Sequence, residues 1–176
     1  MSTRSSVAVI LICGFTSLVL AQAPPARPQP GPEHKKLEYF LGKWNLETET
    51  KANEYVPAGK GSVTETYTLG PGGFYVERRA EGQVPRSLGI MAYDSHAKAY
   101  TSFYANSAGA VGTGTGSVNG NTWTWLTEDR LAGKAVKGRA TITTTSSTQY
   151  TFKFELADAK GGYTTLSEGK GTKDGH

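Results

Sequence analysis

Glu65 is the residue best suited to acid–base chemistry or ligand binding, and it lies in an alternating stretch that also contains Val63 and Tyr67. If Glu65 shares the interior face of a sheet with Val63, Arg78 in the next stretch can face it across a hairpin. A buried carboxylate beside a guanidinium keeps a low pKa, so it binds or orients a ligand more readily than it takes up protons. We predict that this pair is a polar contact for a ligand. In the alternative, the register slips and both charges point to solvent.

Polar aromatic residues form the second group that could contact a ligand. They recur in stretches that favour strands, where such side chains either line one cavity or simply fill the sheet interior. The candidate residues are Tyr67, Tyr93, Tyr100, Tyr104, Trp123 and Trp125. Together with Glu65 and Arg78 they make up the predicted ligand-binding set.

Residue types and spacing give no catalytic or metal site. The histidines are His34, His96 and the terminal His176, and none lies inside a predicted strand. Neither the H-E-x-x-H nor the G-x-S-x-G pattern occurs. Asp94 and His96 share a predicted turn, where an aspartate that stabilises the turn is far commoner than a metal ligand. We predict no catalytic residue, no metal and no cofactor, and the balance is against an enzyme.

A β-sheet must position these side chains. After Trp44, stretches rich in Thr, Tyr, Val and Trp alternate with Gly, Pro, Asn, Asp and Ser clusters, which is typical of an antiparallel all-β chain. Nearly every connection is short enough for a hairpin, and a long meander removes its exposed edges by closing. We predict a single up-and-down antiparallel β-barrel of about ten strands, at residues 43–51, 61–69, 74–82, 86–94, 99–106, 110–118, 122–129, 135–144, 148–156 and 163–172.

Turn residues predict the registers of three hairpins. Asn119-Gly120 suits a two-residue type I′ turn, residues 70–73 join the second and third strands, and an odd-length loop at residues 145–147 joins the eighth and ninth. The predicted cross-strand pairs include Gly114–Trp125, Gly116–Trp123, Glu65–Arg78, Tyr67–Val76, Leu69–Phe74, Val136–Leu156, Gly138–Phe154, Ala140–Phe152 and Ile142–Tyr150. Each indole of the first hairpin then lies over a bare glycine backbone. Because these glycines lie inside a strand, they do not form a phosphate-binding loop.

A short helix precedes the first strand. Pro32 suits the first helical position because its missing N–H has no partner there, and Gly42 supplies a left-handed stop. The helix presents one apolar stripe of Leu37, Phe40 and Leu41. We predict that this stripe covers one end of the barrel.

The first residues are predicted to be a targeting segment. Arg4 precedes an uncharged apolar run at residues 7–20, and Val19 and Ala21 fit the −3 and −1 positions of a signal-peptidase site. The run is short for a membrane span, which needs ~20 residues, so an uncleaved anchor is the weaker alternative. We predict a signal peptide at 1–21, a Pro-rich linker at 22–31 and the barrel domain at 32–176. The protein would then be secreted or periplasmic.

Cysteine content and charge limit the partners. Cys13 lies in the signal segment, and the bulky Ile12 before it disfavours a lipoprotein site, so the mature chain would contain no thiol. The formal net charge of +4 is scattered, and the adjacent basic pairs are far short of a nucleic-acid-binding stripe. We predict no nucleic acid, no membrane span after signal cleavage and a small-molecule partner, with the oligomeric state open.

Two sets of residues resemble a known family. The first is Pro32-Glu33-His34-Lys35-x-Leu37 followed by Leu41-Gly42-Lys43-Trp44. The second runs from Leu88-Gly89-Ile90-Met91-Ala92-Tyr93-Asp94 through Lys98-Ala99-Tyr100 to Tyr104-Ala105-Asn106-Ser107. In this order they are similar to the bacterial family known as domain of unknown function 1579. The resemblance implies a calycin-like, lipocalin-like barrel without an established activity. The chain departs from the family pattern at Ala92, Tyr104 and Asn106, where the family has Gly, Trp and Asp.

The resemblance also bears on Trp44. Gly42-Lys43-Trp44 looks like the G-x-W element of lipocalins, in which the tryptophan plugs one barrel end under a basic side chain from near the C-terminus. It implies that Trp44 is a structural plug and that Lys170 or Lys173 covers its indole ring. Haem barrels of related outline need an axial histidine near the end of the barrel, and no predicted strand supplies one.

The predicted function is non-covalent binding of a small apolar or amphipathic molecule, because barrels of this size often keep room for one ligand. One alternative is a non-catalytic interaction or envelope-associated domain with a filled core. The other is a cofactor-free enzyme of the isomerase or cyclase type, for which Glu65 is the acid–base candidate.

Overall fold

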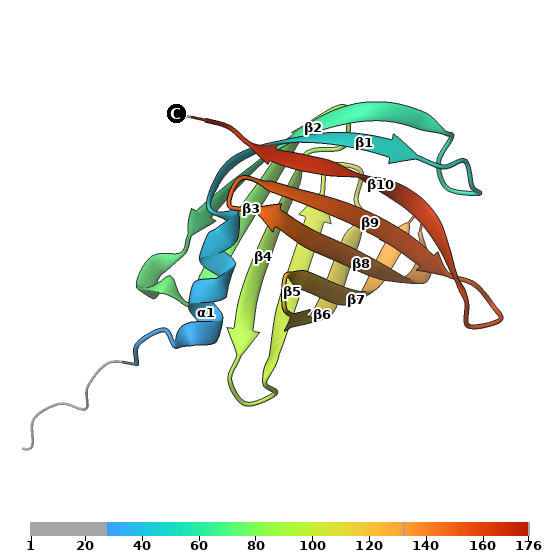
Figure 1. Ribbon diagram of the computed structural model, residues 1–176. Helices are drawn as coiled ribbons and strands as arrows, with labels where there is room; N and C mark the ends of the chain where they lie inside the picture. The colour runs from blue at the N-terminus through green and yellow to red at the C-terminus, as the bar shows by residue number, and fades with distance from the viewer. Residues whose placement is uncertain (1–27, 132, 176) are drawn as a thin grey trace, which may run out of the picture.

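The computed structural model describes residues 28–131 and 133–175. Ten antiparallel strands form one closed barrel, in which consecutive strands pair and β1 also pairs with β10 (Figure 1). The predicted all-β, up-and-down barrel is therefore confirmed. Alternating residues point inward, as the two-residue period of a strand requires.

The strand boundaries agree with the sequence-based prediction to within two residues at each end. The strands are β1 (Gly42–Thr50), β2 (Gly59–Leu69), β3 (Tyr75–Gly82), β4 (Ser87–Asp94), β5 (Ala99–Asn106), β6 (Val111–Asn119), β7 (Thr122–Leu131), β8 (Lys134–Ser146), β9 (Gln149–Ala157) and β10 (Tyr163–Lys173). A short 3₁₀ turn, η2 (Pro71–Gly73), connects β2 to β3.

The predicted registers of the three hairpins are wrong by two residues. The observed partners are Tyr67 with Arg78, Gly116 with Trp125, and Ala140 with Phe154. In the β6–β7 hairpin the central residues are Gly120 and Asn121, with Gly120 at φ +58°, so the turn lies one residue later than predicted. A slip of two residues keeps every side chain on its face, whereas a slip of one would invert the strand. The prediction of which residues face inward is therefore unaffected.

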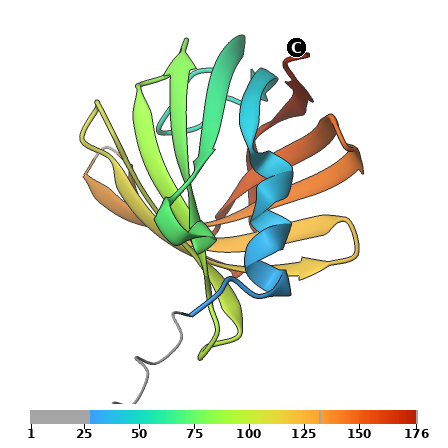
Figure 2. The ribbon, with the colours of Figure 1, turned by 90° about the vertical axis from the view of Figure 1, so that its left-hand side faces the viewer.

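The N-terminal helix closes one end of the barrel, as predicted. It is an α-helical turn, α1 (Pro32–Lys36), continued by a 3₁₀ turn, η1 (Leu37–Phe40), and Gly42 follows with φ +101°. Figure 2 shows this helix in front of the barrel end, with strands on both sides of it. Leu37 and Phe40 are completely buried there beside Trp44.

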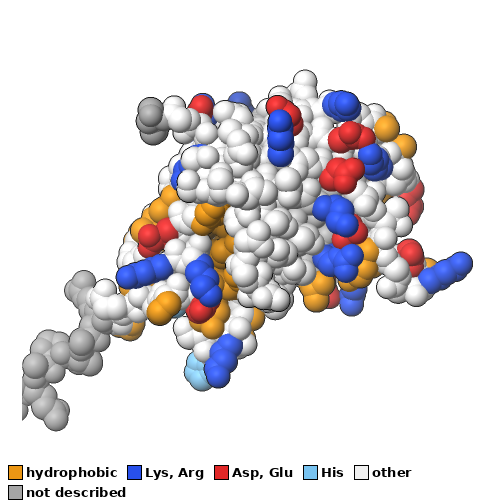
Figure 3. All heavy atoms as spheres, in the orientation of Figure 1, with side chains coloured by type: hydrophobic (Ala, Val, Ile, Leu, Met, Phe, Trp, Pro, Cys, Tyr) orange, Lys and Arg blue, Asp and Glu red, His pale blue; other side chains and the backbone are white. Residues whose placement is uncertain are grey.

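The outer surface is mixed in character. In Figure 3, basic and acidic side chains are interspersed over the sheet around β9 and β10, and hydrophobic side chains gather beside the helix. Within the described ranges, no helix combines the length and the apolar character that a membrane crossing requires.

Candidate functional site

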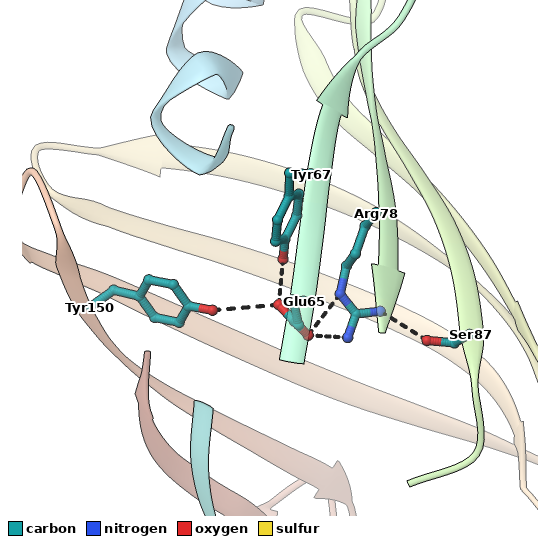
Figure 4. Close-up of polar contacts among 5 residues, drawn as sticks. All are labelled: Glu65, Tyr67, Arg78, Ser87 and Tyr150. Carbon is teal, nitrogen blue, oxygen red and sulfur yellow. Dashed lines mark hydrogen bonds and ion pairs between the residues drawn. The ribbon is translucent and has the colours of Figure 1, made fainter. Parts of the chain in front are cut away.

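An ion pair between a buried carboxylate and a guanidinium that is 28% exposed lies on the inner wall of the barrel, between β2 and β3. Glu65 is 4% exposed, and its Oε1 accepts a hydrogen bond of 2.8 Å from Arg78 Nε and a second from Arg78 Nη2. The Tyr67 hydroxyl donates to Glu65 Oε2 at 2.7 Å, and the Tyr150 hydroxyl lies 3.5 Å from the same oxygen. Arg78 Nη1 donates to Ser87 Oγ at 3.3 Å (Figure 4). These five residues form the polar cluster.

The register explains how the pair forms. Glu65 lies opposite the small Ala80, and Arg78 lies opposite Tyr67, so the two charged residues are diagonal neighbours. Long side chains reach across that diagonal separation in an antiparallel pair. The predicted interior pair is therefore present, although the two residues are not directly opposite as predicted.

The polar cluster is electrostatically balanced. Burial by itself lowers the pKa of Arg78, but the Glu65 carboxylate outweighs that effect and raises it, so the guanidinium stays charged. Burial and the Glu65 charge both raise the pKa of Tyr67 and of Tyr150, which keeps the phenols protonated as donors. Because both oxygens of Glu65 accept hydrogen bonds, the cluster is better suited to orienting a ligand than to removing a proton.

A cavity of about 280 Å³ lies beside the polar cluster. This volume is just below the usual range for small-molecule sites, which begins at about 300 Å³. Its apolar lining includes Leu46, Met91, Trp125, Ile142, Phe152 and Phe154, and its polar lining includes Ser102, Tyr104 and Thr127 together with four members of the cluster. The barrel is therefore hollow, and its cavity is amphipathic.

The structure divides the predicted ligand-binding set into two groups. Five of its members line the cavity: Glu65, Tyr67, Arg78, Tyr104 and Trp125. The other three pack beneath the helix and do not line the cavity. Tyr93 meets His34 edge-on at 5.5 Å between ring centroids, Trp123 meets Phe40 at 5.2 Å, and the Tyr100 hydroxyl donates to Glu33 Oε2 at 2.8 Å. Tyr150, which also lines the cavity, was not predicted as a site residue.

Trp44 occupies the end of the barrel beneath the helix. It is completely buried, and its Nε1 donates a 2.6 Å hydrogen bond to the carbonyl of Phe40. Lys173 Nζ lies 5.4 Å from the centroid of the indole ring, so Lys173 is the basic residue that covers it. Lys170 instead pairs with Glu47 on the outer surface, at 3.2 Å.

Strand β6 has glycines at three inward positions, which make room for side chains of β5 and β7. Gly112, Gly114 and Gly116 each lie between inward side chains of β5 and β7. An added Cβ would be 2.0 Å from Asp129 at Gly112, 2.7 Å from Ser102 at Gly114 and 2.6 Å from Trp125 at Gly116. The neighbouring side chains therefore lean over bare backbone. This was predicted for both tryptophans of β7, and it holds for Trp125 over Gly116, whereas Trp123 lies opposite Val118.

Asp129 is a buried acid that was not among the predicted site residues. It is 3% exposed, and Thr127 Oγ1 donates to its Oδ2 at 2.6 Å. Its Oδ1 is buried and has no hydrogen-bond partner among the described residues. Burial raises the pKa of Asp129, and the nearby Thr127 and Tyr104 hydroxyls partly oppose that rise. The sequence did contain an indication of this position. Every second residue of a strand shares a face, so Asp129 lies on the same inner face as Trp123, Trp125 and Thr127.

Asp94 and His96 lie at the turn between β4 and β5. Asp94 Oδ1 accepts hydrogen bonds from the backbone N–H groups of His96 at 2.8 Å and Ala97 at 3.0 Å, which is the turn-stabilising role. Among the residues that the structure describes, no group of three His, Cys, Asp or Glu side chains is arranged to hold a metal ion.

Comparison with known proteins gives a family and a fold. A family model described as "Protein of unknown function (DUF1579)" matches residues 29–173. The crystal structure of Rv2717c from M. tuberculosis is similar, with a TM-score of 0.62 and 11% identity over 82% of this chain and 99% of that chain. The structure of EF1p2_mFAP2b bound to DFHBI has a TM-score of 0.42 at 12% identity and covers 80% of this chain and 98% of its own. No curated protein matches the sequence.

Proposed function

This chain belongs to the DUF1579 family of proteins of unknown function, and we propose that it is a calycin-like barrel that binds a small amphipathic molecule non-covalently. The observation that carries the proposal is the 280 Å³ cavity, which has apolar side chains on most of its wall and the Glu65–Arg78 pair on one side. A barrel packed only for stability would fill this space, since protein interiors are close-packed.

The lining residues indicate which groups would supply binding affinity and which would orient the ligand. Trp125, Phe152 and Phe154 offer apolar surface, and burying ligand area against them contributes roughly 25 cal/mol per Å². The polar cluster has no net charge to offer, because Arg78 is paired with Glu65. Hydroxyls of Ser102 and Thr127 add neutral polar groups to the wall. The site therefore favours a ligand that is mostly apolar and carries a single polar end.

A cavity-filling substitution tests this function. We expect naphthalene to bind the wild-type protein with micromolar affinity in isothermal titration calorimetry. Ala140→Leu adds a branched side chain to the cavity wall, so binding should weaken by about tenfold or more, while the melting temperature stays equal or rises. Thr141→Leu is the matched control, because Thr141 is the next residue on the opposite face of β8.

Two outcomes would contradict the proposal. Wild-type protein that takes up no naphthalene would remove ligand binding in the cavity. Equal binding by wild type and Ala140→Leu would place the ligand elsewhere on the molecule.

An interaction domain is the second candidate function, and one observation favours it. Leu88, Ile90, Phe103 and Val111 are all exposed on the outer surface of neighbouring strands β4, β5 and β6, and Phe103 is 50% exposed. Contiguous apolar surface of this kind often marks a contact site. A second copy of the chain is the partner to test first, by light scattering after size-exclusion chromatography. Dimers that dissociate in Phe103→Ser would support this function, and a concentration-independent monomer would count against it.

We also propose that the protein is secreted or periplasmic, with a signal peptide at residues 1–21 and a linker at 22–31. The support is the sequence of residues 4–21, which lie outside the described residues. Cell fractionation followed by N-terminal sequencing should find a mature chain that begins at Gln22. A cytoplasmic protein that still begins at Met1 would contradict this.

A further inference from the structure

The wall formed by β5, β6 and β7 changes in polarity along its length. Three pairs of side chains face each other across the glycines of β6: Tyr100 and Trp125 over Gly116, Ser102 and Thr127 over Gly114, and Tyr104 and Asp129 over Gly112. The first pair is aromatic and lies nearest the helix, since the Tyr100 hydroxyl contacts Glu33. The second pair is a pair of hydroxyls, and the third is a phenol with a carboxyl group.

Among the residues that the structure describes, Asp129 has the one buried side-chain polar atom without a hydrogen bond. Its Oδ2 is held by Thr127, while Oδ1 makes no hydrogen bond to any described residue, although the Tyr104 hydroxyl is nearby. A buried acceptor without a donor carries a desolvation penalty, which is larger when the group is charged. A ligand that brings a donor to this atom would remove that penalty. An acceptor on the ligand would increase it.

Gly112 is what allows the third pair to exist. An added Cβ at Gly112 would lie 2.0 Å from Asp129 Oδ1 and 2.4 Å from a ring carbon of Tyr104. Both side chains therefore lean over the bare backbone of Gly112, and Asp129 Oδ1 lies directly above it. Tyr104 and Thr127 line the cavity, whereas Asp129 and Gly112 line a neighbouring hollow of about 350 Å³, so Asp129 borders the cavity at these two residues.

From this arrangement we propose that the ligand lies along β6, with its apolar end beside Trp125 and a hydrogen-bond-donating end, a hydroxyl or an amine, on Asp129. The inference rests on the proposed function and names its ligand class. A carboxylate end is disfavoured because it brings only acceptors to Asp129. Arg78 does not compensate, since two of its nitrogens are already bonded to Glu65.

Three probes with the same alkyl chain test the head-group preference by isothermal titration calorimetry. Decanol and decylamine should bind the wild-type protein at least about tenfold more tightly than decanoate, the factor that one hydrogen-bonded buried acceptor supports. In Asp129→Asn the side-chain amide can donate to a carboxylate. The preference for decylamine over decanoate should therefore fall by about tenfold or reverse.

Glu128→Gln is the matched control, because Glu128 is the adjacent carboxylate on the outer face of β7 and its side chain is 72% exposed. It should keep the wild-type order of the three probes. Naphthalene, which has no polar end, reports separately on the cavity and should bind all three proteins equally.

The outcomes separate the two proposals. Wild-type protein that binds naphthalene but ranks decanoate equal to or above decylamine overturns the Asp129 assignment and leaves the binding function intact. Wild-type protein that binds none of the four probes overturns both. If Asp129→Asn does not fold, the wild-type order of head groups decides by itself.

Discussion

The Glu65–Arg78 pair is held inside the barrel by hydrogen bonds to both charges, so removal of one partner has a defined consequence. Arg78→Met keeps most of the side-chain volume but leaves the buried Glu65 carboxylate without its counter-charge. Breaking a buried pair in this way destabilises a protein by about 3 kcal/mol or more. Urea unfolding followed by circular dichroism should show this loss. Arg79→Met, on the outer face of the same strand, should change the free energy of unfolding little.

A double variant shows whether the loss of stability comes from the unpaired charge of Glu65 or from the missing Arg78 side chain. Glu65→Gln combined with Arg78→Met removes both charges, so the free energy of unfolding should return most of the way to the wild-type value. The two single substitutions should therefore be strongly non-additive. Simple additivity would mean that the two side chains act independently of each other.

The two acids on the inner wall show what could be predicted at the level of residues. Glu65 was placed correctly although its register was wrong, because alternation with Val63 and Tyr67 is insensitive to a slip of two residues. Asp129 was missed because it stands at the predicted end of its strand, where a carboxylate is normally solvated. Its burial depends on a contact across strands, the glycine at position 112, and that pairing requires the correct register.

At the level of elements, the helix gives the family-like motifs a structural meaning. The backbone N–H of Gly31 donates to His34 Nδ1 at 3.1 Å, and the His34 ring meets Tyr93 edge-on. The Tyr100 hydroxyl donates to the carbonyl of Glu33 at 3.0 Å. Residues of the first motif thus bind those of the second, although they are far apart in the sequence. Both motifs fix the helix over the barrel end, which explains why they carry so little information about chemistry.

The packing of the helix predicts a large effect at Phe40. Its ring is completely buried and contacts those of Tyr67, Trp123 and Tyr150. Phe40→Ala should therefore lower the free energy of unfolding by about 3–5 kcal/mol in denaturant titrations. Glu38→Ala, on the exposed side of the same turn, is the control.

Phe40 does not line the cavity, so the Phe40→Ala protein should still bind naphthalene under conditions in which it is folded. A small change in the free energy of unfolding would show that packing of the helix against the barrel end contributes little to stability. A loss of naphthalene binding in folded protein would show that the helix end and the cavity are one site.

The exact positions of the hairpin turns were harder to predict than the strands themselves. A run such as Val118-Asn119-Gly120-Asn121 contains two acceptable two-residue turns, and local preferences alone do not choose between them. The choice is made by the cross-strand packing that follows, here Trp125 over Gly116 and Trp123 opposite Val118. The β8–β9 hairpin adds a register shift between Thr144 and Ser146, which accommodates the extra residue that the sequence indicated.

For the whole molecule, closure was predictable and the cavity was not. Closure follows from edges, because ten consecutive hairpin-linked strands leave two unpaired edges that only β1 and β10 can satisfy. The cavity depends on which side chains meet across the barrel. Three inward glycines in β6 and two more in β10, Gly169 and Gly171, allow neighbouring strands to pack closely over them, which alternation alone does not reveal. The size of the interior is thus a property of the complete set of registers.

The β1–β10 seam gives a prediction for the whole barrel, because it joins the two ends of the fold. Its pairing runs from Trp44 with Lys173 to Thr50 with Ser167. A Cβ at Gly169 would lie 1.9 Å from the backbone carbonyl oxygen of Glu47. Backbone cannot rotate away as a flexible side chain can, so Gly169→Ala should force the two strands apart. We expect a loss of about 3 kcal/mol or more in the free energy of unfolding.

Hydrogen exchange measured by mass spectrometry shows where that loss occurs. In Gly169→Ala the amides of β1 and β10 should exchange faster, while those of β5 to β7 on the far side keep more of their protection, since a seam opens locally before the barrel unfolds. Gly175→Ala is the matched control, because a Cβ there meets no atom within 4 Å. The exposed edges should also promote aggregation at high protein concentration. If exchange in β1 and β10 is unchanged in Gly169→Ala, closure of the barrel does not depend on that glycine.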